Sequence, residues 1–224
     1  AYGVLVLLLS AGGCTSFELF RRWVVSDKKI LELEKATKQT ELQQLKKQIN
    51  PHFLFNMLNN ANILVKDAPD EASQILEKLD NLLRYQLNDS TRREVFLTAD
   101  IQFLTSFLEL EKVRRDHFEY TIFQEGNMEN ICIPPLLFIP FVENAVKHNL
   151  DSDNLSYVHL YFSVHNKQLT FRCENSKPRV PVKREGGIGL ANVKRRLDLL
   201  YESRYTLQIE DKETTYNVNL HLNL

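Results

Sequence analysis

The sequence has 224 residues and a formal net charge of −1, with 43% hydrophobic and 25% charged residues. This length suits one or two domains with a core of ordinary size. The balanced charge excludes the strongly basic field of many nucleic-acid-binding proteins, so no direct nucleic-acid binding is expected. The cysteines Cys14, Cys132 and Cys173 have no metal-binding or redox spacing, which predicts small buried side chains in a reducing compartment.

Residues 1–20 are apolar or small almost without interruption up to Phe17. A membrane-spanning helix needs about 20 apolar residues, so this stretch is predicted to be the end of such a helix. Two arginines and two lysines follow before residue 30, and positive charge directly after a span marks the cytoplasmic side. A signal peptide would carry its charge before the apolar stretch. A buried N-terminal helix is the alternative. Because the sequence starts at Ala1 and not at a Met, we expect a sensing part upstream.

Polar, helix-favouring sequence follows the apolar stretch, with sparse leucine and isoleucine among Lys, Glu and Gln. This pattern predicts a signalling linker helix over residues 21–44. Two later segments, 70–88 and 98–115, carry apolar residues at helical spacing. Residues 45–117 are therefore predicted to form a helical dimerisation unit.

The periodicity changes from helical to alternating in the second half of the chain. Four segments alternate apolar and polar residues, which predicts strands with one buried face. They are residues 157–164, 169–173, 207–209 and 218–222. Helices are expected over residues 135–150 and 188–201. An antiparallel-rich sheet with helices on one face is an α+β sandwich, which we expect over residues 118–224.

His52 lies in the run QINPHFLFN, residues 48–56. On a helix it shares a polar stripe with Asn56 and Asn59, opposite an apolar arc. A neutral imidazole is nucleophilic near pH 7 because its ordinary pKa is about 6.5, so it can accept a phosphoryl group. Pro51 disfavours a straight helix interior, which predicts a bend beside the histidine. These features alone leave a packing or surface histidine as an alternative.

The longer run LKKQINPHFLFNMLN, residues 45–59, resembles the phosphoacceptor motif of LytS/YehU-type sensor histidine kinases. The segments LLRY at 82–85 and LELEKVR at 108–114 are also similar to that family. This resemblance covers roughly residue 42 to the C-terminus. It implies that His52 accepts the γ-phosphate of ATP and passes it to an aspartate on a response regulator.

A second polar cluster lies in PPLLFIPFVENAVKHN, residues 134–149. An amide oxygen suits Mg²⁺, a lysine offsets phosphate charge, and a glutamate can polarise an attacking group. A surface salt bridge between Glu143 and Lys147 is an equal alternative. The run resembles the N box of the GHKL ATPases, which implies that Asn144 coordinates Mg²⁺ and that Glu143 assists catalysis. The resemblance also implies that Lys147 and His148 lie near the phosphates.

Residues 186–197, GGIGLANVKRRL, combine glycines with a predicted helix. Glycines let a backbone approach phosphate closely, and a helix beginning near Ile188 directs free N–H groups at an anion. The run resembles the G box of the same kinases, so Gly187, Gly189 and Leu190 are expected to bind ATP. The basic residues 194–196 are interpreted as partly surface charge. The segment is neither a P-loop nor a dinucleotide-binding fingerprint.

GHKL proteins usually carry an Asp-x-Gly-x-Gly box whose Asp recognises the adenine amino group. No such Asp or Gly pair occurs here, where the strand 169–173 runs into ENSKP. The strand pattern places Asn175 at the Asp position, with Glu174 as the other candidate. An Asn oxygen can accept a hydrogen bond from the amine, but it carries no charge. The basic loop between Lys177 and Gly186 is either a short phosphate-binding lid or a solvated loop.

The three motifs occur in the order of the family and predict a sensor histidine kinase that phosphorylates His52 from Mg-ATP. A non-catalytic dimeric scaffold with a degenerate ATP site and an ATP-driven conformational clamp are the alternatives. The expected partners are a second copy of the chain, the membrane and a response regulator, with the LytTR type as one candidate. The expected location is the inner (cytoplasmic) membrane of a bacterium, with the catalytic region in the cytoplasm.

Overall fold

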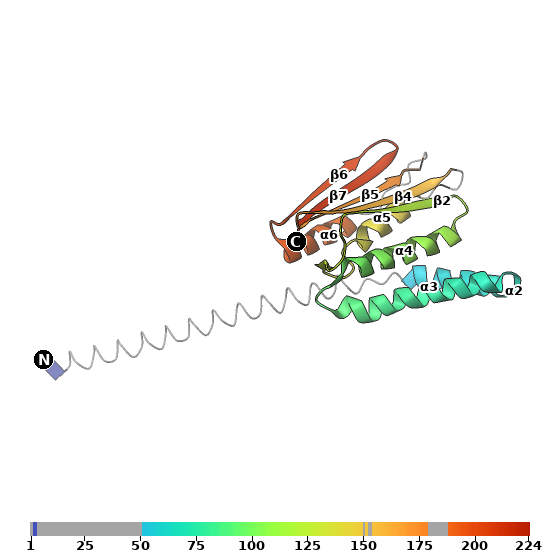
Figure 1. Ribbon diagram of the computed structural model, residues 1–224, viewed down its shortest axis with the longest axis horizontal. Coiled ribbons are helices and arrows are strands. Elements are labelled where there is room, and N and C mark those ends of the chain that lie inside the picture. The colour runs from blue at the N-terminus through green and yellow to red at the C-terminus, as the bar shows by residue number, and fades with distance from the viewer. Residues whose placement is uncertain (1, 4–50, 150, 152–153, 179–187) are drawn as a thin grey trace. The chain divides into compact units, whose positions relative to one another are not determined.

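The computed structural model describes residues 2–3, 51–149, 151, 154–178 and 188–224 (Figure 1). The chain divides into two compact units, residues 1–47 and 48–224, and the second holds nearly all the described residues. The predicted membrane segment, apart from residues 2–3, and the predicted linker helix lie outside the described residues. Within the described part, no helix is both long and apolar enough to cross a membrane.

The second unit begins with a hairpin of two helices, α2 (Pro51–Asp67) and α3 (Pro69–Asn88). Proline is tolerated in the first turn of a helix, because the N–H group it lacks has no intrahelical partner there. Asp70 and Glu71 in the first turn of α3 also stabilise that helix, because their negative charges lie at the positive end of the helix dipole. The bend expected beside Pro51 concerns preceding residues that lie outside the described part.

Each helix of the hairpin buries an apolar stripe with helical spacing. The buried side chains are Phe53, Met57 and Ala61 on α2 and Ala72, Ile75, Leu79 and Leu82 on α3. Residues three and four apart lie on one helix face, so the two stripes face each other along the hairpin. The helical segment predicted over residues 70–88 is confirmed.

The third helix, α4 (Leu97–Arg114), is buried on most of its sides. Phe107 lies against Phe53 of α2, with ring centroids 4.9 Å apart, and Phe103 stacks on Tyr85 of α3 at 4.8 Å. The helix also contacts strand β2 (Phe118–Glu125). It therefore contributes to the core of the hairpin and to the core of the following sheet.

The sheet has five strands in the order β2-β4-β5-β7-β6. Strand β4 (Ser156–His165) is parallel to β2, and the other neighbours are antiparallel. The remaining strands are β5 (Gln168–Ser176), β6 (Tyr205–Asp211) and β7 (Thr215–Asn223). All four expected strands are confirmed, whereas β2 was not predicted. A short 3₁₀ helix (Asp89–Thr91) and the antiparallel pair β1 (Val95–Phe96) and β3 (Cys132–Ile133) complete the connections.

Helices α4, α5 (Ile139–His148) and α6 (Ile188–Tyr201) lie along the same side of the sheet in Figure 1. Phe138, Phe162 and Phe171 form the centre of the layer between them, with Phe138 4.5 Å from Phe171 and 5.2 Å from Phe162. The α+β class predicted from the sequence is confirmed.

Two details differ from the sequence-based expectations. Helix α5 begins at Ile139 rather than near residue 135, because Leu136 takes a left-handed conformation with φ of 55° that a helix cannot contain. The prediction that the cysteines are buried is correct for Cys173 but wrong for Cys132, which is exposed on the two-residue strand β3.

Candidate functional site

His52 is the second residue of α2, and the structure continues that helix through Asn56 and Asn59. The helical spacing therefore puts these three residues on one face of α2. Asn56 is half-buried and Asn59 is exposed. The next two residues after His52, Phe53 and Leu54, turn toward the interior. The start of α2 is thus anchored by the apolar packing of Phe53 and Leu54, and Asn59 further along it is exposed.

A small pocket joins the beginning of α2 to α5. Its lining residues come from α2, α3, α4 and α5: Phe53, Leu54, Leu82, Gln86, Phe103, Phe107, Ile139 and Glu143. Burial, and then the nearby Glu111 carboxylate, raise the pKa of Glu143 to about 7. A carboxyl group with a pKa near neutrality can both hold and release a proton under physiological conditions. Because Glu143 lines this pocket together with Phe53 and Leu54, it lies beside the segment that carries His52.

Helix α5 presents two different polar faces. Asn144 and Lys147 are exposed and lie three residues apart, while Glu143 lines the pocket described above. Among the described residues no ion pair joins Glu143 to Lys147, so the structure does not contain the alternative surface salt bridge. His148 is half-buried at the end of the helix. The structure thus brings Asn144 and Lys147 together and separates them from Glu143.

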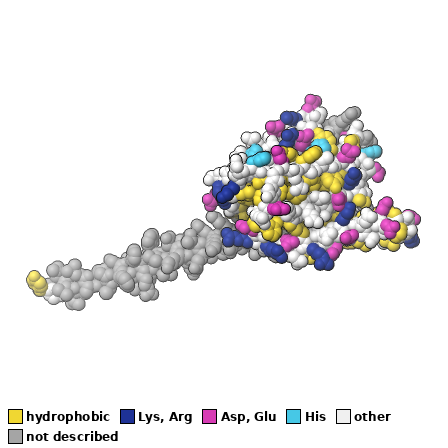
Figure 2. Space-filling model, viewed as in Figure 1, with side chains coloured by type: hydrophobic (Ala, Val, Ile, Leu, Met, Phe, Trp, Pro, Cys, Tyr) yellow, Lys and Arg dark blue, Asp and Glu magenta, His cyan; other side chains and the backbone are white. Residues whose placement is uncertain are grey.

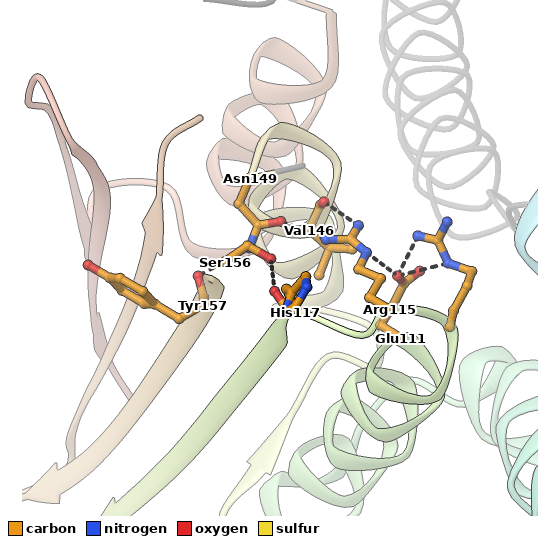
Figure 3. A network of polar contacts seen from close by, with 8 residues as sticks. Glu111, Arg115, His117, Val146, Asn149, Ser156 and Tyr157 are labelled. Atoms are coloured by element: carbon orange, nitrogen blue, oxygen red, sulfur yellow. Dashed lines mark hydrogen bonds and ion pairs between the residues drawn. The ribbon is translucent and has the colours of Figure 1, made fainter. Parts of the chain in front are cut away.

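Arg115 holds the C-terminal end of α5 in place (Figure 3). Its guanidinium donates to the carbonyl oxygen of Val146 at 2.7 Å and to the side-chain oxygen of Asn149 at 2.9 Å. Glu111 fixes the arginine through an ion pair of 3.2 Å, and the Asn149 amide donates to the carbonyl of Tyr157 at 3.1 Å. The C-terminal end of α5 is thereby tied to α4 and β4. The sequence analysis missed Arg115 and Asn149 as supports of this helix.

Arg196 holds the segment that precedes α5. Its guanidinium donates to the carbonyl oxygens of Leu136, at 2.5 Å, and of Pro135. Its side chain is buried. The interpretation of Arg196 as partly surface charge is therefore wrong, because backbone carbonyls of the core take up its donors. Lys194 and Arg195, which directly precede Arg196 on α6, are exposed as expected.

The structure separates the two candidates for the adenine position. Asn175 points to the helix-covered face of the sheet and is 1% exposed, whereas Glu174 lies on the opposite face. Glu174 interacts there with Arg172 at 2.5 Å and accepts a hydrogen bond from Tyr157 at 3.4 Å. The Asn175 Nδ2 donates to the carbonyl of Ser176 at 2.8 Å, and its buried Oδ1 has no partner among the described residues. Oδ1 of Asn175 is thus a buried, unpaired acceptor between the sheet and the helices.

The glycine-rich motif is described only in part. Helix α6 begins at Ile188, as the sequence predicted, and Gly189 and Leu190 lie in its first turn. Gly187 and the basic loop before it lie outside the described residues. Within the described part, no group of three His, Cys, Asp or Glu side chains could hold a metal ion. A Mg²⁺ ion held by one protein amide and by phosphate oxygens needs no such group.

Comparison with known proteins defines the class to which this chain belongs. Residues 40–118, which include His52, match the Histidine kinase family. The sensor protein LytS of Staphylococcus haemolyticus is 30% identical over 203 residues, covering 84% of this chain and 35% of LytS. The sensor histidine kinase YpdA of Escherichia coli is 31% identical over 119 residues, covering 53% of this chain and 21% of YpdA. The chain thus belongs to the LytS-type sensor histidine kinase family.

The chain spans between about a fifth and a third of the length of these two relatives. Solved structures with a similar arrangement include the histidine kinase domain of the blue-light activated histidine kinase EL346 from Erythrobacter litoralis. That domain is 17% identical, with a TM-score of 0.46, and the match covers 84% of this chain and 93% of that one. The catalytic domain of histidine kinase ThkA is 15% identical, with a TM-score of 0.44, and the match covers 58% of this chain and 93% of that one.

Proposed function

We propose that this chain is the kinase core of a two-component sensor, in which His52 receives the γ-phosphate of ATP and passes it to a response regulator. Residues 45–117 would form the dimerisation and phosphotransfer part, and residues 118–224 the ATP-binding part. The observation that carries this proposal is the unpaired Oδ1 of Asn175 beneath the sheet. It supplies an acceptor for the exocyclic amino group of adenine at the position where an Asp is expected.

The orientation of the Asn175 amide supports this assignment. Its Nδ2 is already bonded to the carbonyl of Ser176, so Oδ1 is the atom left to face a ligand. A buried acceptor without a partner costs about 1–3 kcal/mol, and a ligand that donates to it recovers that free energy. An adenine amine donates at this position, whereas the corresponding oxygen of guanine does not. The residue therefore favours adenine nucleotides.

The exposed face of α5 is suited to the phosphates. The amide oxygen of Asn144 would hold Mg²⁺, a hard ion that neutralises phosphate charge when bound. Lys147, three residues further on, offers a cation on the same face. The N–H groups in the first turn of α6, around Gly189, add the partial positive charge of a helix N-terminus. His148 and Gly187 complete the nucleotide-binding set that we propose, together with Leu190.

Glu143 is suited to manage the proton of the attacking imidazole. Phosphoryl transfer needs mainly positioning and neutralisation of charge, but a neutral histidine that bonds to phosphorus must lose its ring proton to remain uncharged. Glu143 shares a pocket with Phe53 and Leu54, the residues that follow His52. With a pKa of about 7, its ionised form is available to accept that proton.

The hairpin surface supports a second copy of the chain as a partner. Large apolar side chains remain exposed or half-exposed on both of its helices: Phe55, Leu58 and Val65 on α2, and Leu76, Leu83 and Leu87 on α3. Helical spacing gathers each trio into one stripe. Two hairpins that bury these stripes against each other form a four-helix bundle.

The location we propose is the bacterial cytoplasmic membrane, with residues 1–20 ending a membrane span and the kinase core in the cytoplasm.

The test is labelling of the chain with γ-labelled ATP and Mg²⁺, in wild type and in His52→Gln. Acid-labile label in wild type and none in the variant is the expected result, because phosphohistidine is lost in acid. Asn144→Ala should also lose the label while keeping the circular-dichroism spectrum of the folded chain. Equal labelling of wild type and His52→Gln would refute the proposal. A scaffold with a degenerate site would show neither label nor nucleotide binding, and a clamp would hydrolyse ATP without retaining label.

A further inference from the structure

A buried carboxylate connects the hairpin to the segment that precedes α5. Asp100, in the first turn of α4, is 0% exposed. Its Oδ1 accepts a hydrogen bond from the hydroxyl of Tyr85 on α3 at 2.6 Å and from the backbone N–H of Leu136 at 3.0 Å. One oxygen atom thus binds a side chain of the hairpin and the backbone of the segment that leads into α5.

The same segment is held from its other side by α6. Arg196 donates to the carbonyl oxygens of Pro135 and Leu136, so the peptide units around Leu136 have partners from both α4 and α6. Leu136 has a φ of 55°, a conformation that is costly for a branched side chain and that persists only when its surroundings fix it. Asp100 and Arg196 provide that fixation. They set the position from which α5, with Asn144 and Lys147, begins.

The chemistry of Asp100 explains why Tyr85 matters. Among the described residues no cation forms an ion pair with Asp100, and its Oδ2 has no hydrogen-bond partner. Burial raises the pKa of Asp100, and the hydrogen bonds from Tyr85 and Leu136, the charge of Arg196 and the backbone N–H of Phe138 oppose that rise. A buried carboxylate is tolerated only if hydrogen bonds compensate its lost hydration. Tyr85 supplies the only side-chain donor to Asp100 among the described residues, and the stacking of its ring on Phe103 fixes the direction of the hydroxyl. The Tyr85–Asp100 bond is therefore a directional link between helices, in contrast to the apolar contacts around it.

We propose that the Tyr85–Asp100–Leu136 hydrogen bonds position the hairpin that carries His52 relative to the nucleotide-binding helix α5, and that Tyr85 and Asp100 are positioning residues for phosphoryl transfer. This inference rests on the proposed kinase function. Tyr85 acts on the hairpin side of the link, and Arg196 acts on the nucleotide side. Loss of Tyr85 should therefore slow transfer to His52 at saturating ATP and leave ATP affinity intact. Loss of Arg196 should weaken ATP binding itself.

The experiment compares Tyr85→Phe with Tyr205→Phe in the full chain. Both changes delete a Tyr–Asp hydrogen bond of 2.6 Å and one oxygen atom, but the bond from Tyr205 to Asp198 is exposed and lies at β6, away from the hairpin. The dissociation constant for Mg-ATP and the rate of acid-labile labelling at saturating ATP are measured for each. For Tyr85→Phe, we expect a labelling rate about tenfold lower, the order that one buried hydrogen bond supplies, with ATP affinity unchanged. Tyr205→Phe should leave both quantities unchanged.

Asp100 provides the conservative rescue. Asp100→Asn keeps an oxygen that can accept from Tyr85 and Leu136, whereas Asp100→Ala removes both acceptors. The Asn variant should retain most of the labelling rate, and the Ala variant should lose it along with thermal stability. Label in wild type and an unchanged rate in Tyr85→Phe would overturn this inference alone. A parallel fall of rate, ATP affinity and melting temperature in Tyr85→Phe would also overturn it, by showing a merely structural role. Absence of label in wild type would refute the kinase function and this inference with it.

Discussion

The hairpin α2–α3 and the five-stranded sheet bury their apolar residues to different extents. In the sheet, the inward side chains of the central strands, such as Leu160, Phe171 and Leu220, have no exposed surface. In the hairpin, Phe55, Ile63 and Leu87 remain more than half exposed. Hydrophobic side chains also reach the surface among the charged ones on the face shown in Figure 2. The sheet with its helices has a complete core, whereas the hairpin presents an apolar surface that association would cover.

The two parts of the molecule are held in place by different kinds of contact. The core beneath the sheet is formed within one chain, by strands that pair along their whole length. The hairpin packs against α4 on one side, and its other side can pack against a second surface. A part whose packing is completed by a partner can change its arrangement when that partner moves, which suits the element that carries His52.

The largest effect should follow from a charge placed on the exposed stripe of the hairpin. Leu58→Glu puts a carboxylate where we expect a second copy to bury the leucine, and this substitution occurs twice in a dimer. Burial of one leucine contributes about 2 kcal/mol, so dimer dissociation should become at least about a hundredfold easier. Analytical ultracentrifugation of the kinase core over a range of concentrations measures this change.

Val113→Glu is the matched control for the stripe. Val113 on α4 is 47% exposed and Leu58 is 46% exposed, but Val113 lies outside the hairpin. It should leave the oligomeric state unchanged. Dimers of the Leu58→Glu variant as tight as those of wild type would show that the exposed stripe is not the dimer surface, and the contrast between hairpin and sheet would then need another explanation.

The second effect concerns Glu143, which lies where the hairpin meets α5. Because burial raises its pKa from 4.5 to about 7, the folded chain holds this proton more tightly than the unfolded chain does. The free energy of unfolding should therefore fall as the pH rises from about 4.5 to about 7. Glu143→Gln carries no ionisable group, and near pH 8 it should be more stable than wild type by about 3 kcal/mol. Urea unfolding measured across this pH range tests the difference.

Glu129→Gln is the control for that pH dependence, because Glu129 is exposed in a loop outside the pocket. Its unfolding curves should follow those of wild type at every pH. If Glu143→Gln and wild type lost stability in parallel between about pH 4.5 and pH 7, Glu143 would not be the buried acid at this junction.

The smallest of these effects concerns the inner face of the sheet. Asn175→Ala removes the free Oδ1 acceptor, and the affinity for ATP should fall about tenfold, the order of one hydrogen bond to a neutral group. Glu174→Gln, on the outer face of the same strand, should leave the affinity unchanged. Calorimetric titration with Mg-ATP measures both. Weaker binding in Glu174→Gln together with normal binding in Asn175→Ala would reverse the assignment of the adenine position.

Much of the fold follows from local sequence. The period-two alternation of residues 157–164 and 218–222 and the helical spacing of residues 70–88 correspond to β4, β7 and α3. Strand β2 was not predicted although Phe118, Tyr120 and Ile122 alternate in it. As an edge strand it pairs with β4 alone, and most of its residues are half-buried or exposed, so its pattern is weak.

The residues of the candidate site also fall into two groups, those in contiguous motifs and those whose partners are distant in the chain. The histidine motif and the glycine-rich helix were recognisable because their residues are contiguous, and α6 begins at the residue where the glycines predicted it. Asp100, Arg115 and Arg196 were missed or misread because their partners lie far away in the chain. Arg196 binds Leu136 across 60 residues, and no local pattern contains that distance.

The sequence by itself therefore determined most of the element types, the α+β class and the candidate residues of the site, because periodicity, helix-start chemistry and contiguous motifs are local properties. Only the tertiary structure decided which side of a strand or helix meets the core. It placed Asn175 inward and Glu174 outward, and it turned Glu143 toward the helix of His52 and away from Lys147. The physical reason is that alternation defines two faces but does not say which is buried, since burial depends on elements distant in the chain.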